Sequence, residues 1–167
     1  MSICMRILAG TIPVALVAAA GPAHAYANRS TGSLPVSLTV DNSCRLVTKP
    51  LVFGIVTGSP TIRATTTLVA QCTAGTPYSV GIDNGKNWDG RTRRMYGGQA
   101  QGKVWYADYK LYRDAAYSAL WSTAAGERKT GVIPASGSET MTIYGEAVAK
   151  NIRANAYIDT VTVVFDF

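Results

Sequence analysis

Residues 33–44 read SLPVSLTVDNSC, and the fold depends on what the first eight of them pair with. Apolar and polar residues alternate along this stretch, and the apolar ones are Leu34, Val36, Leu38 and Val40. A period of two is typical of a strand with one apolar and one polar face. Asp-Asn-Ser follows as a turn signal. Such a strand needs a sheet to join, and that sheet belongs either to the same chain or to another copy.

The sequence ahead of this stretch has the features of a secretory signal peptide. An apolar run from Ile7 to Ala20 follows Arg6, and Ala23-His24-Ala25 matches an A-x-A cleavage site. The run is too short to span a bilayer comfortably. We therefore expect cleavage after Ala25 and a mature chain of 167 − 25 = 142 residues, which is enough for one domain with a buried core.

Cleavage would leave Cys44 and Cys72 as the cysteines and would remove His24, the one histidine of the chain. Two cysteines in an exported protein indicate a disulfide. The bond would close a loop of 72 − 44 = 28 residues, for which chain entropy predicts a stabilisation of about 3–4 kcal/mol. The alternative is a pair of separate buried thiols.

The charge pattern gives little support for a nucleic-acid partner. The formal net charge is +6, or +5 without Arg6, and only Arg91, Arg93 and Arg94 cluster. Nucleic-acid-binding proteins concentrate basic residues in a stripe with aromatic side chains. A solvated loop is the expected role of the arginine cluster, and loose attraction to an anionic surface is the alternative.

The rest of the chain has strong strand signals and few helical ones. Strand candidates occupy residues 51–56, 65–72, 78–82, 103–112, 139–147 and 157–167, and Asp83-Asn84-Gly85-Lys86 is a hairpin-type turn signal. Residues 88–102 and 122–131 are expected to be surface loops. Residues 114–121 suggest a short helix with Asp114 as its N-cap. Short strands with turns between them predict an all-β protein with a β-sandwich fold.

The chemistry of the mature chain argues against an enzyme. Without histidine there is no Ser-His-Asp triad and no histidine metal ligand, and oxidised cysteines are not nucleophiles. The acidic residues, Asp83 and Asp108 among them, are dispersed. We therefore expect no catalysis, no metal and no cofactor. Aromatic residues would line a sugar site or, more commonly, the core and edges of a sandwich: Trp88, Trp105, Tyr106, Tyr109, Tyr112 and Trp121.

A set of short motifs in a fixed order resembles the spore coat protein U domain, the subunit family of archaic chaperone–usher pili in Gram-negative bacteria. The motifs, after the alternating stretch before Cys44, are Leu51-Val52-Phe53-Gly54, Val69 to Tyr78, Asp83-Asn84-Gly85, Arg94-Met95, Tyr109 to Asp114, Tyr144-Gly145 and Tyr157 to Val163. The resemblance covers nearly the whole mature chain. One departure is Ala156, where the family usually has glycine.

The resemblance implies an immunoglobulin-like domain that lacks its final strand and is completed by a donor strand from another subunit or a chaperone. It divides the chain into a signal peptide at 1–25, an N-terminal extension with the donor strand at 26–42 and a β-sandwich at 43–167. Leu34, Val36, Leu38 and Val40 would be the donor side chains. One wall of the acceptor groove would contain Val161, Val163, Phe165 and Phe167.

The expected function is therefore that of a structural pilin. The partners implied by the resemblance are a periplasmic chaperone, an outer-membrane usher, and other copies of this chain or related pilins. After export to the periplasm the subunit would enter a surface fimbrium that supports adhesion and biofilm formation. The alternatives are a secreted surface coat protein, a carbohydrate-binding adhesin module that uses the aromatic loops, and, least favoured, a secreted hydrolase.

Overall fold

The computed structural model describes residues 33–56, 61–150 and 152–167. The expected signal peptide at 1–25 and the first part of the expected extension lie outside the described residues, as does the Gly-Ser-Pro turn signal at 58–60. By its internal contacts the chain divides into a unit that ends at Leu38 and a unit from Thr39 to Phe167. The domain limits expected from the sequence stay a prediction.

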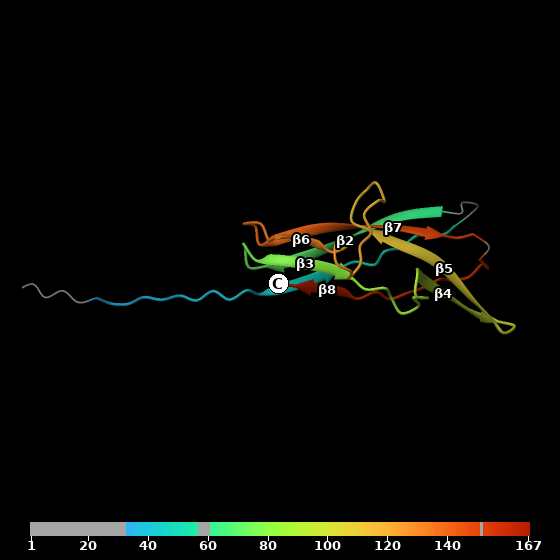
Figure 1. Cartoon of the computed structure of the whole chain (residues 1–167), viewed down its shortest axis with the longest axis horizontal. Helices are drawn as coiled ribbons and strands as arrows, with labels where there is room; N and C mark the ends of the chain where they lie inside the picture. Colours follow the sequence, from blue (N-terminus) through green and yellow to red (C-terminus); the bar gives the residue numbers. More distant parts are fainter. Residues whose placement is uncertain (1–32, 57–60, 151) are drawn as a thin grey trace, which may run out of the picture. The chain divides into compact units, whose positions relative to one another are not determined.

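The second unit consists of eight antiparallel strands in two sheets (Figure 1). The five-stranded sheet has the order β1-β2-β7-β5-β4, and the three-stranded sheet has the order β6-β3-β8. The strands are β1 (Cys44–Thr48), β2 (Thr61–Cys72), β3 (Pro77–Ile82), β4 (Arg93–Ala100), β5 (Lys103–Tyr112), β6 (Lys129–Val132), β7 (Ser138–Val148) and β8 (Val163–Asp166). The described residues contain no helix, so none of them forms a helix able to cross a membrane.

The core forms where the alternating side chains of the two sheets meet. In β7 the buried residues Met141, Ile143 and Ala147 alternate with more exposed ones, which is the period expected of a strand with one buried face. Side chains from both sheets complete the core, among them Leu68, Tyr78, Val80, Ile82, Tyr109, Leu111, Trp121 and Ile133. Trp121 is fully buried, and its indole N–H donates to the Val80 carbonyl at 3.0 Å.

The disulfide predicted from the sequence is confirmed. Cys44 and Cys72 are directly opposite one another in the register of β1 and β2, with an S–S distance of 2.09 Å. The turn beyond Cys72 also holds the residues before β1, because the Thr73 hydroxyl donates to the Asp41 carbonyl and the Thr76 hydroxyl donates to Asn42 Oδ1. The start of the sandwich is therefore fixed to the end of β2.

Two expected loops contain strands. Residues 93–100 form β4, which pairs with β5 through Arg93↔Tyr109 and the following residues, and residues 129–132 form β6. Gln101 and Gly102 join β4 to β5 with φ values of 51° and 72°. Positive φ at both central residues is the geometry of a tight two-residue hairpin turn. The glycine content of 97–102 therefore serves a bulged strand and its turn instead of a long loop.

The helix expected at 114–121 is wrong. This segment is a series of turns, and the Asp114 carboxylate accepts hydrogen bonds from the backbone N–H groups of Ser118 and Ala119. Such side-chain-to-backbone bonds compete with helix formation. The Asp83–Lys86 turn exists, but it leads from β3 in one sheet to β4 in the other and so does not close a hairpin.

Candidate functional site: an open groove and an unpaired arm

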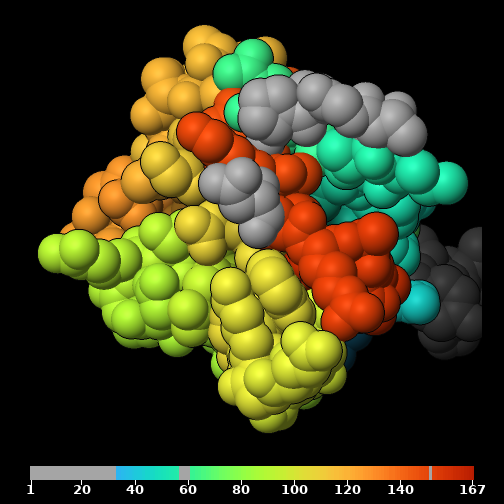
Figure 2. Space-filling model, turned by 90° about the vertical axis from the view of Figure 1, so that its right-hand side faces the viewer, coloured from blue at the N-terminus to red at the C-terminus, as the bar shows by residue number. Residues whose placement is uncertain are grey.

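An apolar groove of about 1440 Å³ opens along one side of the sandwich domain. One wall is segment 49–56, which follows β1, and the other wall is the closing segment, defined here as residues 152–163. The floor consists mainly of inward side chains of the strands, which are Ile62, Ile82, Met95, Ala107, Tyr109, Leu111, Ile143 and Ala147. In Figure 2 the red atoms of the chain after β7 are seen between the yellow β4–β5 hairpin and the teal atoms of segment 49–56.

Segment 49–56 is a wall without a neighbouring strand. Its last hydrogen bonds are at Lys49, whose N–H donates to the Thr67 carbonyl and whose carbonyl accepts from the Thr66 hydroxyl. From Pro50 to Val56 the backbone makes no hydrogen bond with any described residue. The backbone of this segment therefore presents the unpaired N–H and C=O groups that a sheet edge offers to an added strand.

The side chains of segment 49–56 divide between the core and solvent. Leu51 and Phe53 pack against the core, whereas Val52 is 71% exposed and Ile55 is 96% exposed. Gly145 of β7 makes the inward packing possible, because a Cβ there would overlap Leu51. The sequence predicts a strand at 51–56, but the structure has a wall there that belongs to no strand and has no partner strand in the described part of the chain.

Hydrogen bonds fix the closing segment to the loop after β3. The Asp159 carboxylate accepts from the backbone N–H of Lys86 at 3.1 Å, from the Asn87 amide at 2.9 Å and from the Tyr109 hydroxyl at 2.7 Å. Burial and the bond to Asp159 together raise the pKa of Tyr109 far above its ordinary value. Tyr109 is therefore a neutral donor at physiological pH, and it ties the segment to the groove floor.

Asp83 holds the next part of the closing segment. Its N–H donates to the Thr162 carbonyl at 2.9 Å, and its carboxylate accepts from the Thr162 N–H at 2.8 Å. Burial acts to raise the pKa of Asp83, but hydrogen bonds from Thr162 and Gly85 outweigh it and lower the pKa below the ordinary value. The carboxylate is therefore charged at neutral pH and fixes the closing segment next to Ile82.

The closing strand is shorter than the sequence predicts. Only Val163–Asp166 pair with β3, and Ile158 forms an isolated antiparallel bridge with Tyr96 of β4. The closing segment thus touches the edge of the five-stranded sheet at one end and leads into the three-stranded sheet at the other. It joins the two layers along the same side of the domain as the groove.

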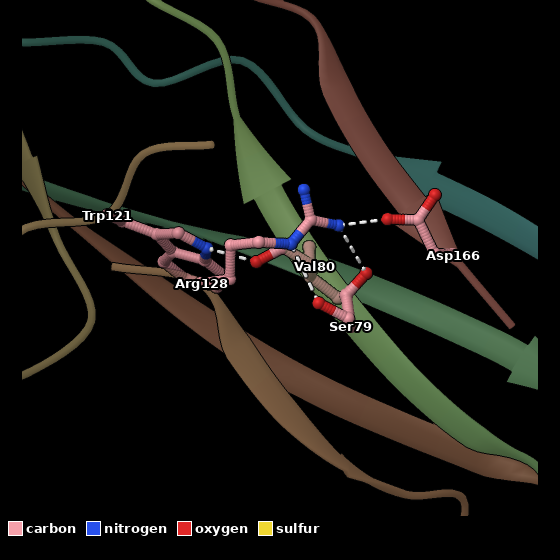
Figure 3. A network of polar contacts seen from close by, with 5 residues as sticks. All are labelled: Ser79, Val80, Trp121, Arg128 and Asp166. Atoms are coloured by element: carbon pink, nitrogen blue, oxygen red, sulfur yellow. Dashed lines mark hydrogen bonds and ion pairs between the residues drawn. The ribbon is translucent and has the colours of Figure 1, made fainter. Parts of the chain in front are cut away.

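Arg128 fastens β8 to its neighbour (Figure 3). Its guanidinium lies across β3, where Nε donates to Ser79 Oγ at 2.7 Å and Nη2 donates to the Ser79 carbonyl at 3.0 Å. The same Nη2 forms an ion pair with Asp166 of β8. A single side chain therefore connects β3 to the strand that continues the groove wall.

The structure places only half of the expected groove-wall residues at the groove. Val161 and Val163 line it. Phe165 packs on the core side of β8 and stacks on Tyr78 with ring centroids 5.6 Å apart, and Phe167 is 57% exposed beside it. Sequence reasoning missed Asp159 and Tyr157, because their roles depend on partners that lie about 50 residues or more away in the sequence.

The four expected donor side chains are exposed and unpaired. Leu34, Val36, Leu38 and Val40 are 84%, 87%, 88% and 67% exposed, and residues 33–40, called the arm below, belong to no strand. Single exposed apolar residues are ordinary on protein surfaces, but a regular apolar row marks an interaction site. Among the described residues no three metal-ligating side chains gather into a candidate metal centre.

The sequence matches the family model of the Spore Coat Protein U domain over residues 30–164. The chain belongs to this family, which confirms the resemblance seen in its motifs. The comparison with curated proteins found no match.

Among solved structures, the chain is similar to one described as the CsuC–CsuE chaperone–tip adhesion subunit pre-assembly complex from archaic chaperone–usher Csu pili of Acinetobacter baumannii. The TM-score is 0.57 and the identity is 20%, over 77% of this chain and 40% of that chain. This likeness supports the predicted immunoglobulin-like fold. A weaker likeness, with a TM-score of 0.31 and 13% identity over 72% of this chain and 38% of that chain, is to a chaperone–tip adhesin complex of CFA/I fimbriae biogenesis. Each match therefore covers less than half the length of the solved chain.

Proposed function

We propose that the protein is a structural, non-catalytic pilus subunit that is exported to the periplasm and polymerises into a chaperone–usher fibre at the cell surface. Membership of the Spore Coat Protein U domain family and a fold shared with a structure from a chaperone–subunit complex support this assignment. The observation that carries it is the combination of an unpaired apolar arm with an open apolar groove in a single chain.

In the proposed joint, the arm of one copy enters the groove of the next as an added strand. Segment 49–56 and the arm each contain eight residues, and backbone hydrogen bonds between them would satisfy the unpaired edge. Burial of the four apolar side chains would contribute about 6–12 kcal/mol gross, before the entropy of ordering the arm is subtracted. Pro35 has no amide hydrogen, so it should sit where the donor strand needs no hydrogen bond.

The same groove explains why the subunit would need a chaperone before assembly. An open apolar groove of this volume is an aggregation hazard. A chaperone strand would cover it in the periplasm, and at an outer-membrane usher the arm of the next subunit would replace that strand. The proposed domain boundaries are those expected from the sequence: a signal peptide at 1–25, the extension with the donor strand at 26–42 and the β-sandwich at 43–167. The proposed fibre supports adhesion and biofilm formation.

A pair of substitutions in the arm tests this proposal. Leu38→Asp puts a carboxylate on the apolar face of the arm, and Thr39→Asp puts the same charge on the opposite face one residue later. The full chain is produced with its chaperone and usher, and unboiled samples are run on a denaturing gel. We expect a ladder of stable multimers for wild type and Thr39→Asp, and chaperone-bound monomer for Leu38→Asp, because an unpaired buried charge is prohibitive. Identical ladders for the two variants would contradict the proposal.

A further inference from the structure

A second hollow lies where three loops meet. Of its lining residues, Tyr109 alone also lines the groove. The volume of this hollow is about 310 Å³, at the lower end of the range of small-molecule sites. The loop after β3, the start of β4, the end of β5 and the loop around Ser122 surround it. Its lining residues are Asn84, Trp88, Arg91, Thr92, Arg93, Tyr109, Lys110, Leu120, Ser122 and Glu127.

The floor of this hollow is rigid because its polar groups already have partners. Arg93 is only 7% exposed, and its guanidinium donates to the carbonyls of Asp83, Ile82 and Trp121 at 2.8–2.9 Å. The Tyr109 hydroxyl donates to Asp159. A guanidinium keeps its positive charge at neutral pH, and the carboxylates of Asp83, Glu127 and Asp159 interact electrostatically with that of Arg93. The floor is therefore fixed and its charge is balanced from within the domain, so a charged ligand would meet the side chains of the rim.

The rim carries charged and polar groups without partners. Arg91 and Lys110 are exposed, and neither side chain makes a hydrogen bond or ion pair with any described residue. The Asp89 carboxylate accepts a hydrogen bond from the backbone N–H of Arg91, and the Arg91 guanidinium makes no bond to it. The residue opposite Lys110 in the sheet is Glu146, which pairs with Arg63 instead. Two cations at the rim thus remain available to a ligand.

The rest of the lining contains an exposed aromatic ring and a single carboxylate that is already hydrogen-bonded. Trp88 is 47% exposed beside the hollow. The one carboxylate of the lining, Glu127, accepts from the Ser122 hydroxyl at 2.6 Å. Since carboxylates of the domain balance Arg93, the two rim cations, Arg91 and Lys110, are the charges that favour an anionic ligand. The exposed tryptophan favours a ligand with an apolar ring face.

We propose that this hollow binds one acidic sugar ring, such as a uronic acid residue of a surface polysaccharide. The C–H face of the ring would rest on Trp88, and the ring carboxylate would meet Arg91 and Lys110. A guanidinium matches the planar geometry of a carboxylate, which makes it a better partner than a neutral donor. The hollow has room for a single ring and only two free cations, whereas nucleic acids require an extended basic stripe.

The test compares two sugars that differ at one group. The full chain is titrated with sodium galacturonate and, separately, with galactose, which has a neutral CH₂OH in place of the carboxylate. The indole N–H signal of Trp88 is followed by NMR and assigned through Trp88→Phe. We expect a saturable shift with galacturonate, affinity for galactose weaker by about tenfold or more, and no shift of the buried Trp121 signal.

Two variants complete the test. Arg91→Gln combined with Lys110→Gln should weaken galacturonate binding by about tenfold or more, while Lys103→Gln should leave it unchanged, since that cation stacks on Trp105 away from the hollow. Equal binding of the two sugars, equal effects of sodium acetate and galacturonate, or an unaffected double variant would each overturn the proposal. Fibre assembly does not enter this readout, so failure here leaves the pilus proposal standing.

Discussion

Gly97 of β4 lies directly against the closing segment. A Cβ at this position would overlap the ring of Tyr157, and the Gly97 carbonyl accepts a hydrogen bond from the Asn155 amide. In the same way, a Cβ on Gly145 would overlap Leu51 of segment 49–56. Both walls of the groove thus rest on positions where only hydrogen fits.

Replacement of Gly97 by alanine should therefore destabilise the domain. The new methyl group must displace Tyr157, and overpacking of this kind costs about 1–3 kcal/mol. Thermal or urea unfolding measures the loss. The double variant Gly97→Ala, Tyr157→Ala should lose less stability than the two single changes added together, because the clash is gone. Strict additivity would show that Tyr157 is not the cause.

The loop that replaces the expected helix predicts a dependence on pH. Hydrogen bonds from the N–H of Ala119 and from Ser118 lower the pKa of Asp114 below its ordinary value. A lowered carboxyl pKa stabilises the folded chain above the unfolded pKa of about 3.9, and this stabilisation is lost as the pH falls through the folded pKa. Asp114→Asn should thus be less stable than wild type at neutral pH.

The difference in stability between Asp114→Asn and wild type should shrink as the pH falls below about 4. Melting temperatures measured at a series of pH values check this. Asp108→Asn is the matched control, because Asp108 is exposed on the neighbouring β5 and its carboxylate makes no hydrogen bond with a described residue. A constant difference across the pH range would mean that the Asp114 carboxylate does not hold the loop.

At the scale of single residues, the sequence indicates local patterns but not distant pairs. The alternation at 34–40 and the two cysteines follow from periodicity and from the rules for exported proteins. Asp159 gave no signal of this kind, since its three partners are Lys86, Asn87 and Tyr109, which lie 50 to 73 residues away. Its role is a consequence of the tertiary fold.

At the scale of elements, β8 is the short strand on which one groove wall depends. It pairs with β3 over four residues, and Arg128 connects the two strands through Ser79 and Asp166 (Figure 3). Hydrogen bonds to a charged group are worth about 1.5–3 kcal/mol, although exposure of Asp166 reduces the share of the ion pair.

Arg128→Met should consequently loosen β8. Amide hydrogen exchange at Val164 and Asp166, which lie opposite Gly81 and Ser79 at the hydrogen-bonded positions of the ladder, should become about tenfold faster, because local opening no longer breaks the arginine contacts. Lys129→Met is the control, since it removes a neighbouring cation whose side chain has no partner among the described residues. If both variants exchange alike at β8, Arg128 is not what holds the strand.

The elements that could be predicted are those rich in β-branched or aromatic residues, or with a clear alternation. The structure has β2, β3, β5 and β7 close to the expected residues. Strand β4 was missed because Gly97-Gly98 and the bulge that they form interrupt its pattern, and β6 has only four residues. Segment 49–56 has strand-like residues but pairs with no strand that the structure describes, and no sequence rule predicts that.

At the scale of the whole molecule, the chain carries two complementary features, an apolar arm and an apolar groove. They are different surfaces, and contacts between different surfaces on successive copies generate open chains of subunits when the rotation between copies does not close a ring. The wall at 49–56 adds a row of backbone groups without partners among the described residues. We therefore expect a filament instead of a closed oligomer.

The most direct test places a photo-cross-linking amino acid at position 38 of the arm in assembled fibres. Fibres are built from a mixture of isotopically light and heavy subunits, and cross-linked peptides are identified by mass spectrometry. Position 39 is the control, because it lies on the other face of the arm. We expect position 38 to link to residues 49–56 or 152–163 of a different copy, seen as mixed light–heavy pairs. Links confined to the same copy, or to surfaces outside the groove, would contradict it.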